Sequence, residues 1–420
     1  MLLALWLLAC KEGPAVDTAP FESGLDAAQL RRALAMSPPG PVPADPTNRV
    51  ADDPDAAIFG QMLYFETRLS GNNRVSCATC HPPDHGFADP EPLSTGISLT
   101  GRHAPHVTDA AYNRWQFWDG RADSQWSQAL GPLESEAEHG GSRLQYAHLI
   151  QGDDDLRQAY ELVFGVMPDL SDPGRFPPTG RPVPGQPNHP YQLAWDGMSE
   201  ADQRTVSTIF ANIGKSIAAY ERLIVTGRAP LDDYVAALAA EDSEGLDALS
   251  EPAQRGLSLF VGDAGCHFCH SGPLLTDLEF HNIGLPNPED ATGADPGRYD
   301  GIATVLAAEF NGLSEYSDDP EYANIKLRNL YQGPEHYGQF KTPSLRNVEH
   351  TDPYMHDGRF ATLEEVVTHY NEANTEPPVG HREEIVMPLD LSEEELADLV
   401  AFLTEALSGE PIPEALTHAP

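Results

Sequence analysis

The sequences Cys77-Ala78-Thr79-Cys80-His81 and Cys266-His267-Phe268-Cys269-His270 are two copies of one pattern, a pair of cysteines followed directly by a histidine. The two-residue spacing places both thiols on one edge of a porphyrin, where they form thioethers with its vinyl groups. The histidine that follows then reaches the iron as the proximal ligand. The pattern therefore predicts two covalently attached haem c groups, with His81 and His270 as axial ligands.

Zinc binding and disulfide formation are the alternatives for these four cysteines. A Cys-x-x-Cys pair can donate to zinc, and four cysteines in an oxidising compartment can form two disulfides. Neither alternative accounts for the histidine that follows each pair. The fifth cysteine, Cys10, belongs to neither pair.

Residues 1–10 have the pattern of a lipoprotein-type signal peptide. A short apolar run from Leu2 to Ala9 precedes Cys10, which is the expected lipidation site. The run is too short to span a bilayer as a stable helix, and it lacks the preceding Lys or Arg of a standard signal. We expect the protein in the periplasm or cell envelope, with a membrane contact only through a lipid anchor.

The composition is that of a globular and strongly acidic protein. The chain has 420 residues, of which 40% are hydrophobic, and this length allows two or three domains with buried cores. It carries 65 acidic and 25 basic residues, a formal net charge of −40. Such a charge disfavours nucleic acid as a partner and favours a basic protein, although plain solubility accounts for it equally well.

The chain divides into a tether and two larger parts. Residues 11–50 contain the stretch from Ser37 to Pro43, whose prolines favour an extended backbone and predict a tether. Residues 51–240 and 241–420 each contain one haem motif. We predict an all-α fold with two cytochrome c-like haem domains packed against each other, with long irregular loops.

Helical periodicity is clear in three segments. Residues 198–225 and 391–407 have apolar side chains at spacings of three and four, and Ser392 with Glu395 forms a capping box at the start of the second segment. Residues 252–260 have the pattern of a helix that leads into the second haem motif. Sustained alternation of apolar and polar residues, which is typical of strands, is weak throughout the sequence.

Longer motifs surround the two haem sites, and they read Gln116-Phe117-Trp118-Asp119-Gly120-Arg121-Ala122, Phe340-Lys341-Thr342-Pro343-Ser344-Leu345-Arg346-Asn347-Val348 and Pro353-Tyr354-Met355-His356-Asp357-Gly358. With the haem motifs, they resemble the bacterial dihaem cytochrome c peroxidase family, which includes the MauG-type enzymes, over residues 56–407. Residues 168–190 and the loop near 284–330 have the character of insertions. The resemblance implies an enzyme that reduces hydrogen peroxide at the N-terminal haem, with electrons passed through the C-terminal haem.

The resemblance also implies roles for residues near the first haem. Trp118 matches the tryptophan that lies between the two haems in the family. Gln128 and Glu138 match the family's peroxide pocket, in which the carboxylate transfers the peroxide proton and the amide orients the peroxide. Glu134 and Glu136 lie close to Glu138 in the sequence, so periodicity alone favours a solvated charge at that position.

One departure from the family concerns the sixth ligand of the first haem. Many members have a capping histidine there, but residues 92–101, where it would lie, contain none. We therefore expect an open coordination position that needs no reductive activation. His85, His103 and His106 are weaker candidates for this position.

A second departure concerns the distal ligand of the second haem. Counted from His356, the position of the family's methionine is Tyr370, which resembles the MauG-type branch. A phenolate lowers the reduction potential of the iron, whereas a thioether raises it. We favour Tyr370 over the alternative Met387, which directly precedes a proline, and over His369.

The family also places a calcium ion between the domains, and Thr351 and Pro353 match two of its ligand positions. The position of its asparagine ligand is His103 in this chain. Calcium prefers hard oxygen ligands, so this substitution argues against the ion.

The resemblance implies two partners, hydrogen peroxide and a small electron-donor protein. A basic cytochrome c or a cupredoxin suits the acidic surface of this chain. Two alternative functions stay open at this point. One is a MauG-like oxidation of a protein substrate, and the other is passive electron transfer by two haems without turnover.

Overall fold

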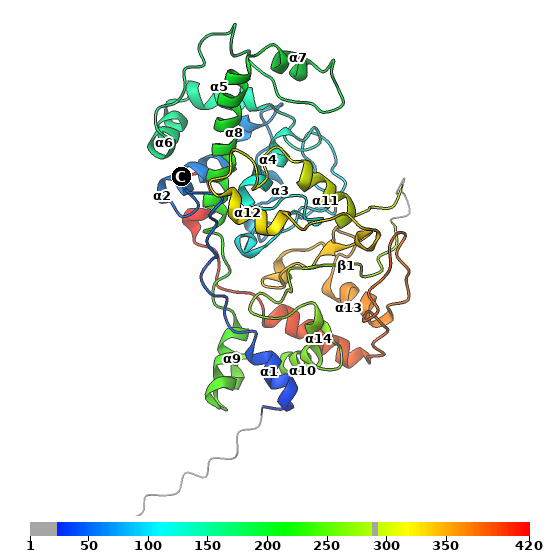
Figure 1. Cartoon of the computed structure of the whole chain (residues 1–420). Helices are drawn as coiled ribbons and strands as arrows, with labels where there is room; N and C mark the ends of the chain where they lie inside the picture. The colour runs from blue at the N-terminus through cyan, green and yellow to red at the C-terminus, as the bar shows by residue number, and fades with distance from the viewer. Residues whose placement is uncertain (1–22, 288–292) are drawn as a thin grey trace, which may run out of the picture.

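The structure is a computed structural model that describes residues 23–287 and 293–420, and it is mostly helical (Figure 1). The expected signal peptide and Cys10 lie outside the described residues. Among these residues the only strands are β1 (Phe280–His281) and β2 (Phe340–Lys341), which pair antiparallel. No described helix is long and apolar enough to cross a membrane.

The first apolar core lies among helices from the N-terminal half of the chain. These helices are α2 (Pro54–Tyr64), α4 (Gln125–Glu134), α5 (Arg143–Gly152), α6 (Asp154–Phe164), α7 (Pro190–Asp196) and α8 (Glu200–Glu221). Trp126 and Tyr220 are fully buried in this core. The first haem motif forms the short helix α3 (Cys77–Cys80) beside it, with Cys77 packed against the core.

The second apolar core lies among helices that flank the second haem motif. These are α1 (Ala27–Leu34), α9 (Pro230–Ala240), α10 (Glu251–Val261), α13 (Leu363–Glu372) and α14 (Glu393–Glu405). Phe260 and Phe402 pack against each other at its centre, with ring centroids 5.1 Å apart. The structure thus has one apolar core for each motif.

The three predicted helices are confirmed as α8, α10 and α14. Helix α14 has the predicted capping box, in which the Ser392 side chain accepts from Glu395 N and the Glu395 side chain accepts from Ser392 N. Ser199 and Ser250 cap α8 and α10 in a similar way, each accepting from a backbone N–H in the first turn. These caps satisfy N–H groups that lack partners within the helix, and they fix where each helix begins.

The expected tether over residues 11–50 is wrong for its described part. Helix α1 packs against α10, where Gln29 Nε2 donates to Ser258 O at 3.0 Å and Arg32 donates to Val261 O at 2.6 Å. Ala33 and Met36 are buried in the second core. The prolines after residue 37 end this helix, but the apolar face before them holds it on the core.

The expected boundary at residue 240 also differs from the packing. Helix α9 buries Leu231, Tyr234 and Leu238 in the second core, so the change from one core to the other lies before residue 230. The reason is that the apolar face of α9 packs against α1 and against the short turn Gly245–Ala248.

Two segments cross back from the C-terminal half to the first core. The stretch near 284–330, expected as a loop insertion, contains α11 (Arg298–Ala307) and α12 (Pro320–Leu327). Between these helices Glu309 pairs with Arg143 at 2.8 Å and Asp318 pairs with Lys215 at 2.6 Å. The end of the chain returns as well, because Gln61 Nε2 donates to Ala415 O at 2.6 Å.

A glycine forms the closest helix contact in each core. A Cβ at Gly60 of α2 would lie 1.8 Å from the Ser216 carbonyl oxygen of α8, and a Cβ at Gly256 of α10 would lie 2.0 Å from the Asp398 carbonyl oxygen of α14. These are backbone atoms, so the helices would have to separate to accept a side chain. The two haem motifs are therefore each preceded by a helix that crosses another at a glycine.

We predict that Gly60→Ala and Gly256→Ala each lower the free energy of unfolding, by about 1–3 kcal/mol as in overpacked cores. Chemical denaturation of the holoprotein would measure this loss. Gly152→Ala is the matched control, because a Cβ there meets nothing within 4 Å. Unchanged stability in both crossing variants would show that the helices separate at little cost.

Candidate functional site

The axial histidine of the first motif is oriented by one hydrogen bond. His81 Nδ1 lies 3.2 Å from the carbonyl oxygen of Phe87. A carbonyl only accepts, so Nδ1 carries the proton and the Nε2 lone pair is left for a metal. Burial lowers the pKa of His81 to about 4, which keeps the ring neutral and able to ligate.

The second motif repeats this arrangement. His270 Nδ1 donates to the carbonyl oxygen of Leu275 at 2.9 Å, and burial lowers the pKa of His270 as well. Both acceptor residues have left-handed backbones, with φ of 58° at Phe87 and 51° at Leu275. Non-glycine residues adopt this region at a cost of about 1–3 kcal/mol and often at functional sites. The two loops are therefore held in a strained form that aims their carbonyls at the histidines.

The described cysteines fit covalently bound haem. Cys77, Cys80, Cys266 and Cys269 are all free thiols, so the disulfide alternative finds no support among them. A cavity of about 440 Å³ opens over the second motif, and it leaves room for a porphyrin ring there.

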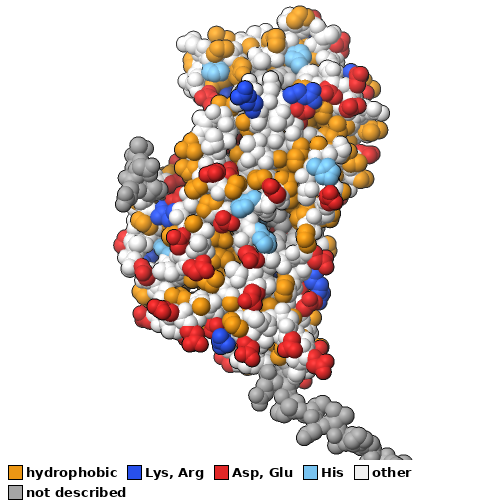
Figure 2. All heavy atoms as spheres, turned by 180° about the vertical axis from the view of Figure 1, so that it is seen from behind, with side chains coloured by type: hydrophobic (Ala, Val, Ile, Leu, Met, Phe, Trp, Pro, Cys, Tyr) orange, Lys and Arg blue, Asp and Glu red, His pale blue; other side chains and the backbone are white. Residues whose placement is uncertain are grey.

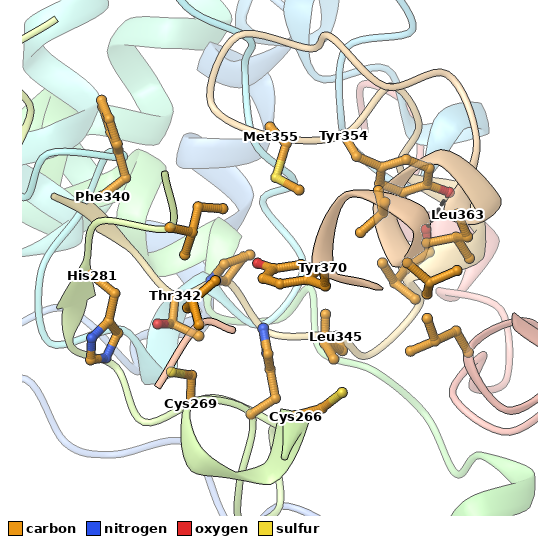
Figure 3. Close-up of a pocket in the computed structure, with 18 of the residues that line it drawn as sticks. Cys266, Cys269, His281, Phe340, Thr342, Leu345, Tyr354, Met355, Leu363 and Tyr370 are labelled. Carbon is orange, nitrogen blue, oxygen red and sulfur yellow. Dashed lines mark hydrogen bonds between the residues drawn. The ribbon is translucent and has the colours of Figure 1, made fainter. Parts of the chain in front are cut away.

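The cavity at the second motif has mainly apolar walls, drawn in Figure 3. The Tyr370 ring, from α13, lies over the turn that carries Cys266 and Cys269. Burial raises the pKa of Tyr370, and the charges of the two thiols add to the rise. Met387 also lines the cavity, but it is 61% exposed. Tyr370 is thus the more enclosed of the two predicted ligands.

Trp118 lies at the boundary between the two motifs. It lines the cavity of the second motif, where its carbonyl oxygen accepts from Lys341 N at 2.7 Å. Its Nε1 donates to the carbonyl oxygen of His103 at 2.9 Å. Charge repulsion from His103 adds to the lowering of the pKa of His81, which places His103 near the first motif. Trp115 and Trp126, by contrast, are core residues.

The three neighbouring glutamates have different surroundings. Glu134 pairs with the buried Arg143 at 2.9 Å, and the side chain of Glu136 is 63% exposed. Burial raises the pKa of Glu138, against the opposing charge of Arg121. Glu138 is therefore the one carboxyl of the three that is half-buried without a strong ion pair.

Glu138 lies beside the first haem motif. Burial, together with the carboxylates of Asp89 and Glu138, raises the pKa of the Cys80 thiol to about 12. Gln128 is half-buried on α4, and its side chain forms no hydrogen bond within the described part of the chain. Both predicted pocket residues thus retain polar atoms for a small ligand.

The three histidines considered as sixth ligands of the first haem are each hydrogen-bonded to a backbone carbonyl. His103 Nδ1 donates to Glu91 O at 3.1 Å, His106 Nδ1 donates to Thr108 O at 2.8 Å, and His85 Nε2 donates to Asp352 O at 2.6 Å. His103 and His106 line the cavity of the second motif.

The residues at the expected calcium position do not fit that ion. The Asp352 carbonyl, between Thr351 and Pro353, is already bonded to His85. His103 supplies a ring nitrogen where the family has an amide oxygen, and burial lowers its pKa. Calcium takes six to eight oxygen ligands, and a ring nitrogen at this position does not suit it.

Two further residues near the motifs were not singled out in the sequence. Lys341 lines the cavity of the second motif. Glu221 of α8 is buried near Cys77, and burial raises the pKa of Glu221 to about 8. The sequence could have indicated Glu221, because this charged residue lies next to Ile217 and Tyr220 on the apolar face of a predicted helix.

Comparison with known proteins supports the resemblance. The sequence model of the family described as "Di-haem cytochrome c peroxidase" matches residues 54–240. The chain is 34% identical to cytochrome-c peroxidase IdrP1 of Denitromonas iodatirespirans, over 90% of this chain and 87% of that protein. It is 30% identical to methylamine utilization protein MauG of Methylorubrum extorquens, over 100% and 98%. A crystal structure of a MauG-like protein associated with microbial copper homeostasis superposes with a TM-score of 0.62 and 26% identity, over 91% and 97%.

We predict that calcium removal leaves this protein unchanged, because His103 supplies a ring nitrogen at the position of the family's asparagine oxygen ligand. Treatment of the holoprotein with a calcium chelator should alter neither the visible spectrum nor peroxide turnover, and calorimetry should detect no calcium binding. A loss of turnover that added calcium restores, and added magnesium does not, would contradict this.

Proposed function

Since the chain belongs to the di-haem cytochrome c peroxidase family, we propose that it reduces hydrogen peroxide at the Cys77/Cys80/His81 site, with electrons supplied from the Cys266/Cys269/His270 site. The observation that carries this proposal is the half-buried carboxyl of Glu138, with its raised pKa, beside the first motif. In this proposal each apolar core, with its motif, is one cytochrome c-like haem domain.

When bound, the two haems supply the redox chemistry, in which hydrogen peroxide, two electrons and two protons give two water molecules. The residues of the chain supply the proton management. Glu138, as a carboxylate, accepts a proton from one peroxide oxygen and donates it to the departing oxygen. Gln128 orients the peroxide by hydrogen bonding through its free amide. The raised pKa of Glu138 suits both halves of this transfer.

Trp118 is proposed to couple the two sites. Two hydrogen bonds hold this residue in place. The indole Nε1 donates to the His103 carbonyl oxygen, and the Trp118 backbone carbonyl accepts from Lys341 N. A ring with a π system, held rigidly between two redox groups, shortens the gap that electrons must cross. Rigid attachment also keeps that distance constant.

A MauG-like oxidation of a protein substrate is the second candidate function, and the enclosed Tyr370 favours it. We propose that Tyr370, rather than the exposed Met387, is the distal ligand at the second motif. A phenolate ligand stabilises oxidised iron, which suits the storage of oxidising equivalents. His369 contacts the Tyr370 ring but is not among the residues that line the cavity, so it is the weaker choice.

The electron donor is proposed to be a small basic protein. Acidic side chains are spread over the face shown in Figure 2, with few Lys or Arg among them, and the formal net charge is −40. Opposite charges speed the encounter of two proteins. We propose a location in the periplasm or cell envelope, which suits covalent haem attachment, and lipidation at Cys10 stays a proposal.

We predict that Glu138→Gln lowers peroxide turnover by about 10²–10⁴-fold, the usual contribution of a general acid–base group. Steady-state peroxide reduction with a chemical donor would measure it. Glu136→Gln is the matched control, because this neighbour is exposed. Both variants should keep two attached haems.

The pH profile gives a second check on Glu138. The group must be ionised to accept a proton, and its pKa is raised above the usual 4.5. Wild-type turnover should therefore decline as the pH falls through that raised pKa, and Glu136→Gln should show the same profile. Full turnover in Glu138→Gln would show that another group transfers the proton.

We predict that hydrogen peroxide, added in one equivalent to the fully oxidised protein, changes its visible and near-infrared spectrum without any reductant. Tyr370→Phe should abolish or greatly shorten this change, because the phenolate is lost, and Met387→Leu should preserve it. If Met387→Leu alone removes the change, Met387 is the ligand. If the wild-type protein needs one electron first, the first site is capped.

A further inference from the structure

A buried lysine lines the cavity of the second motif without an acceptor for its charge. Lys341 is 9% exposed and lies on β2, where its backbone N–H donates to the Trp118 carbonyl and its partner across the sheet is Phe280. Within residues 23–287 and 293–420, its ammonium group has no hydrogen-bond or ion-pair partner. Burial alone lowers the pKa of Lys341, to about 8.

The other buried cations of the described chain are all paired. Lys215 bonds Asp318 at 2.6 Å, and Lys326 donates to the Asp123 carbonyl. The fully buried Arg346 bonds Asp232 at 2.8 Å. Lys341 is therefore an exception within the same structure.

An unpaired buried charge is costly. Removing an ammonium group from water without a partner costs several kcal/mol, unless it is compensated by an opposite charge. The walls of the cavity do not supply one. His106, which is close to Lys341, is neutral, because burial lowers its pKa to about 4. Asp263, an acidic residue in the wall, is exposed and forms no ion pair with Lys341.

The compensating charge must then come from what fills the cavity. The cavity holds the thiols Cys266 and Cys269, the oriented His270 and otherwise mainly apolar walls. Haem c matches each of these features, since it has an apolar ring, two thioether positions, an iron and two carboxylate-bearing propionates. We propose that Lys341 binds a propionate of the haem attached at the second motif.

This assignment gives Lys341 a role in setting the haem's reduction potential. The reduced haem carries one positive charge less than the oxidised haem, so a nearby cation stabilises the reduced form and raises the potential. The inference requires haem at the second motif, but it does not require peroxide chemistry at the first. Loss of peroxide turnover would therefore not bear on it.

The experiment compares three variants of the holoprotein by potentiometric titration of the second haem. Lys341→Met removes the charge at similar length, Lys341→Arg keeps it, and Lys326→Met is the matched control, a largely buried lysine outside the cavity. We expect Lys341→Met to shift the potential downward. Lys341→Arg and Lys326→Met should stay close to wild type, with two haems attached in each.

Other results would decide the proposal as well. If Lys341→Met fails to retain the second haem while Lys341→Arg retains it, the positive charge is needed by the cavity's occupant, and the proposal stands. An unchanged potential in Lys341→Met, or loss of the haem in both variants, would overturn it. A crystal structure of the holoprotein with no propionate oxygen within hydrogen-bond distance of the Lys341 ammonium would also overturn it.

Discussion

The bond from a histidine Nδ1 to a backbone carbonyl is the interaction on which both sites depend. It fixes the tautomer of His81 and of His270, so that the Nε2 lone pair of each ring is left for a metal. The carbonyls belong to Phe87 and Leu275, which are buried and have positive φ. A buried aromatic or leucine side chain anchors a strained backbone better than glycine would, because packing holds it in place. Packing in the two cores therefore holds these two carbonyls in position.

The two cores support their haem motifs with the same kind of helix crossing. A helix before each motif crosses a later helix at a glycine, Gly60 at Ser216 and Gly256 at Asp398. Close crossing brings the motif-bearing loop onto a rigid pair of helices. The segments that return from the C-terminal half, through Glu309 and Asp318, then attach to the first core by ion pairs.

The sequence predicts what is encoded locally and loses what depends on distant partners. Covalent chemistry requires the Cys-x-x-Cys-His spacing, so the motifs are visible in the sequence alone, and the Ser392 cap is equally local. Helix α1 was missed because the prolines after residue 37 dominate the composition of residues 11–50. Its docking depends on Ser258 and Val261, more than two hundred residues away. The different surroundings of Glu134 and Glu138 likewise depend on Arg143 and Arg121, and periodicity in the sequence does not predict these contacts. The roles of Gln128, Glu138 and Tyr370 rest on family resemblance and stay predictions.

The charged groups near the two sites differ, and this difference suits a division of labour. Carboxyls surround the first motif, since Glu138, Asp89 and Glu221 all act on its thiols. Groups of this kind accept and return protons, which peroxide reduction needs. The second cavity has an unpaired cation, Lys341, and a neutral His106 instead. A cation favours the reduced form of a redox group, so it suits a site that receives electrons and passes them on. Trp118 lies where these two environments meet, and a phenolate from Tyr370 would oppose the cation by favouring oxidised iron. The balance between Lys341 and Tyr370 would then decide whether the second site mainly supplies electrons or stores oxidising equivalents, which is the physical difference between the two candidate functions.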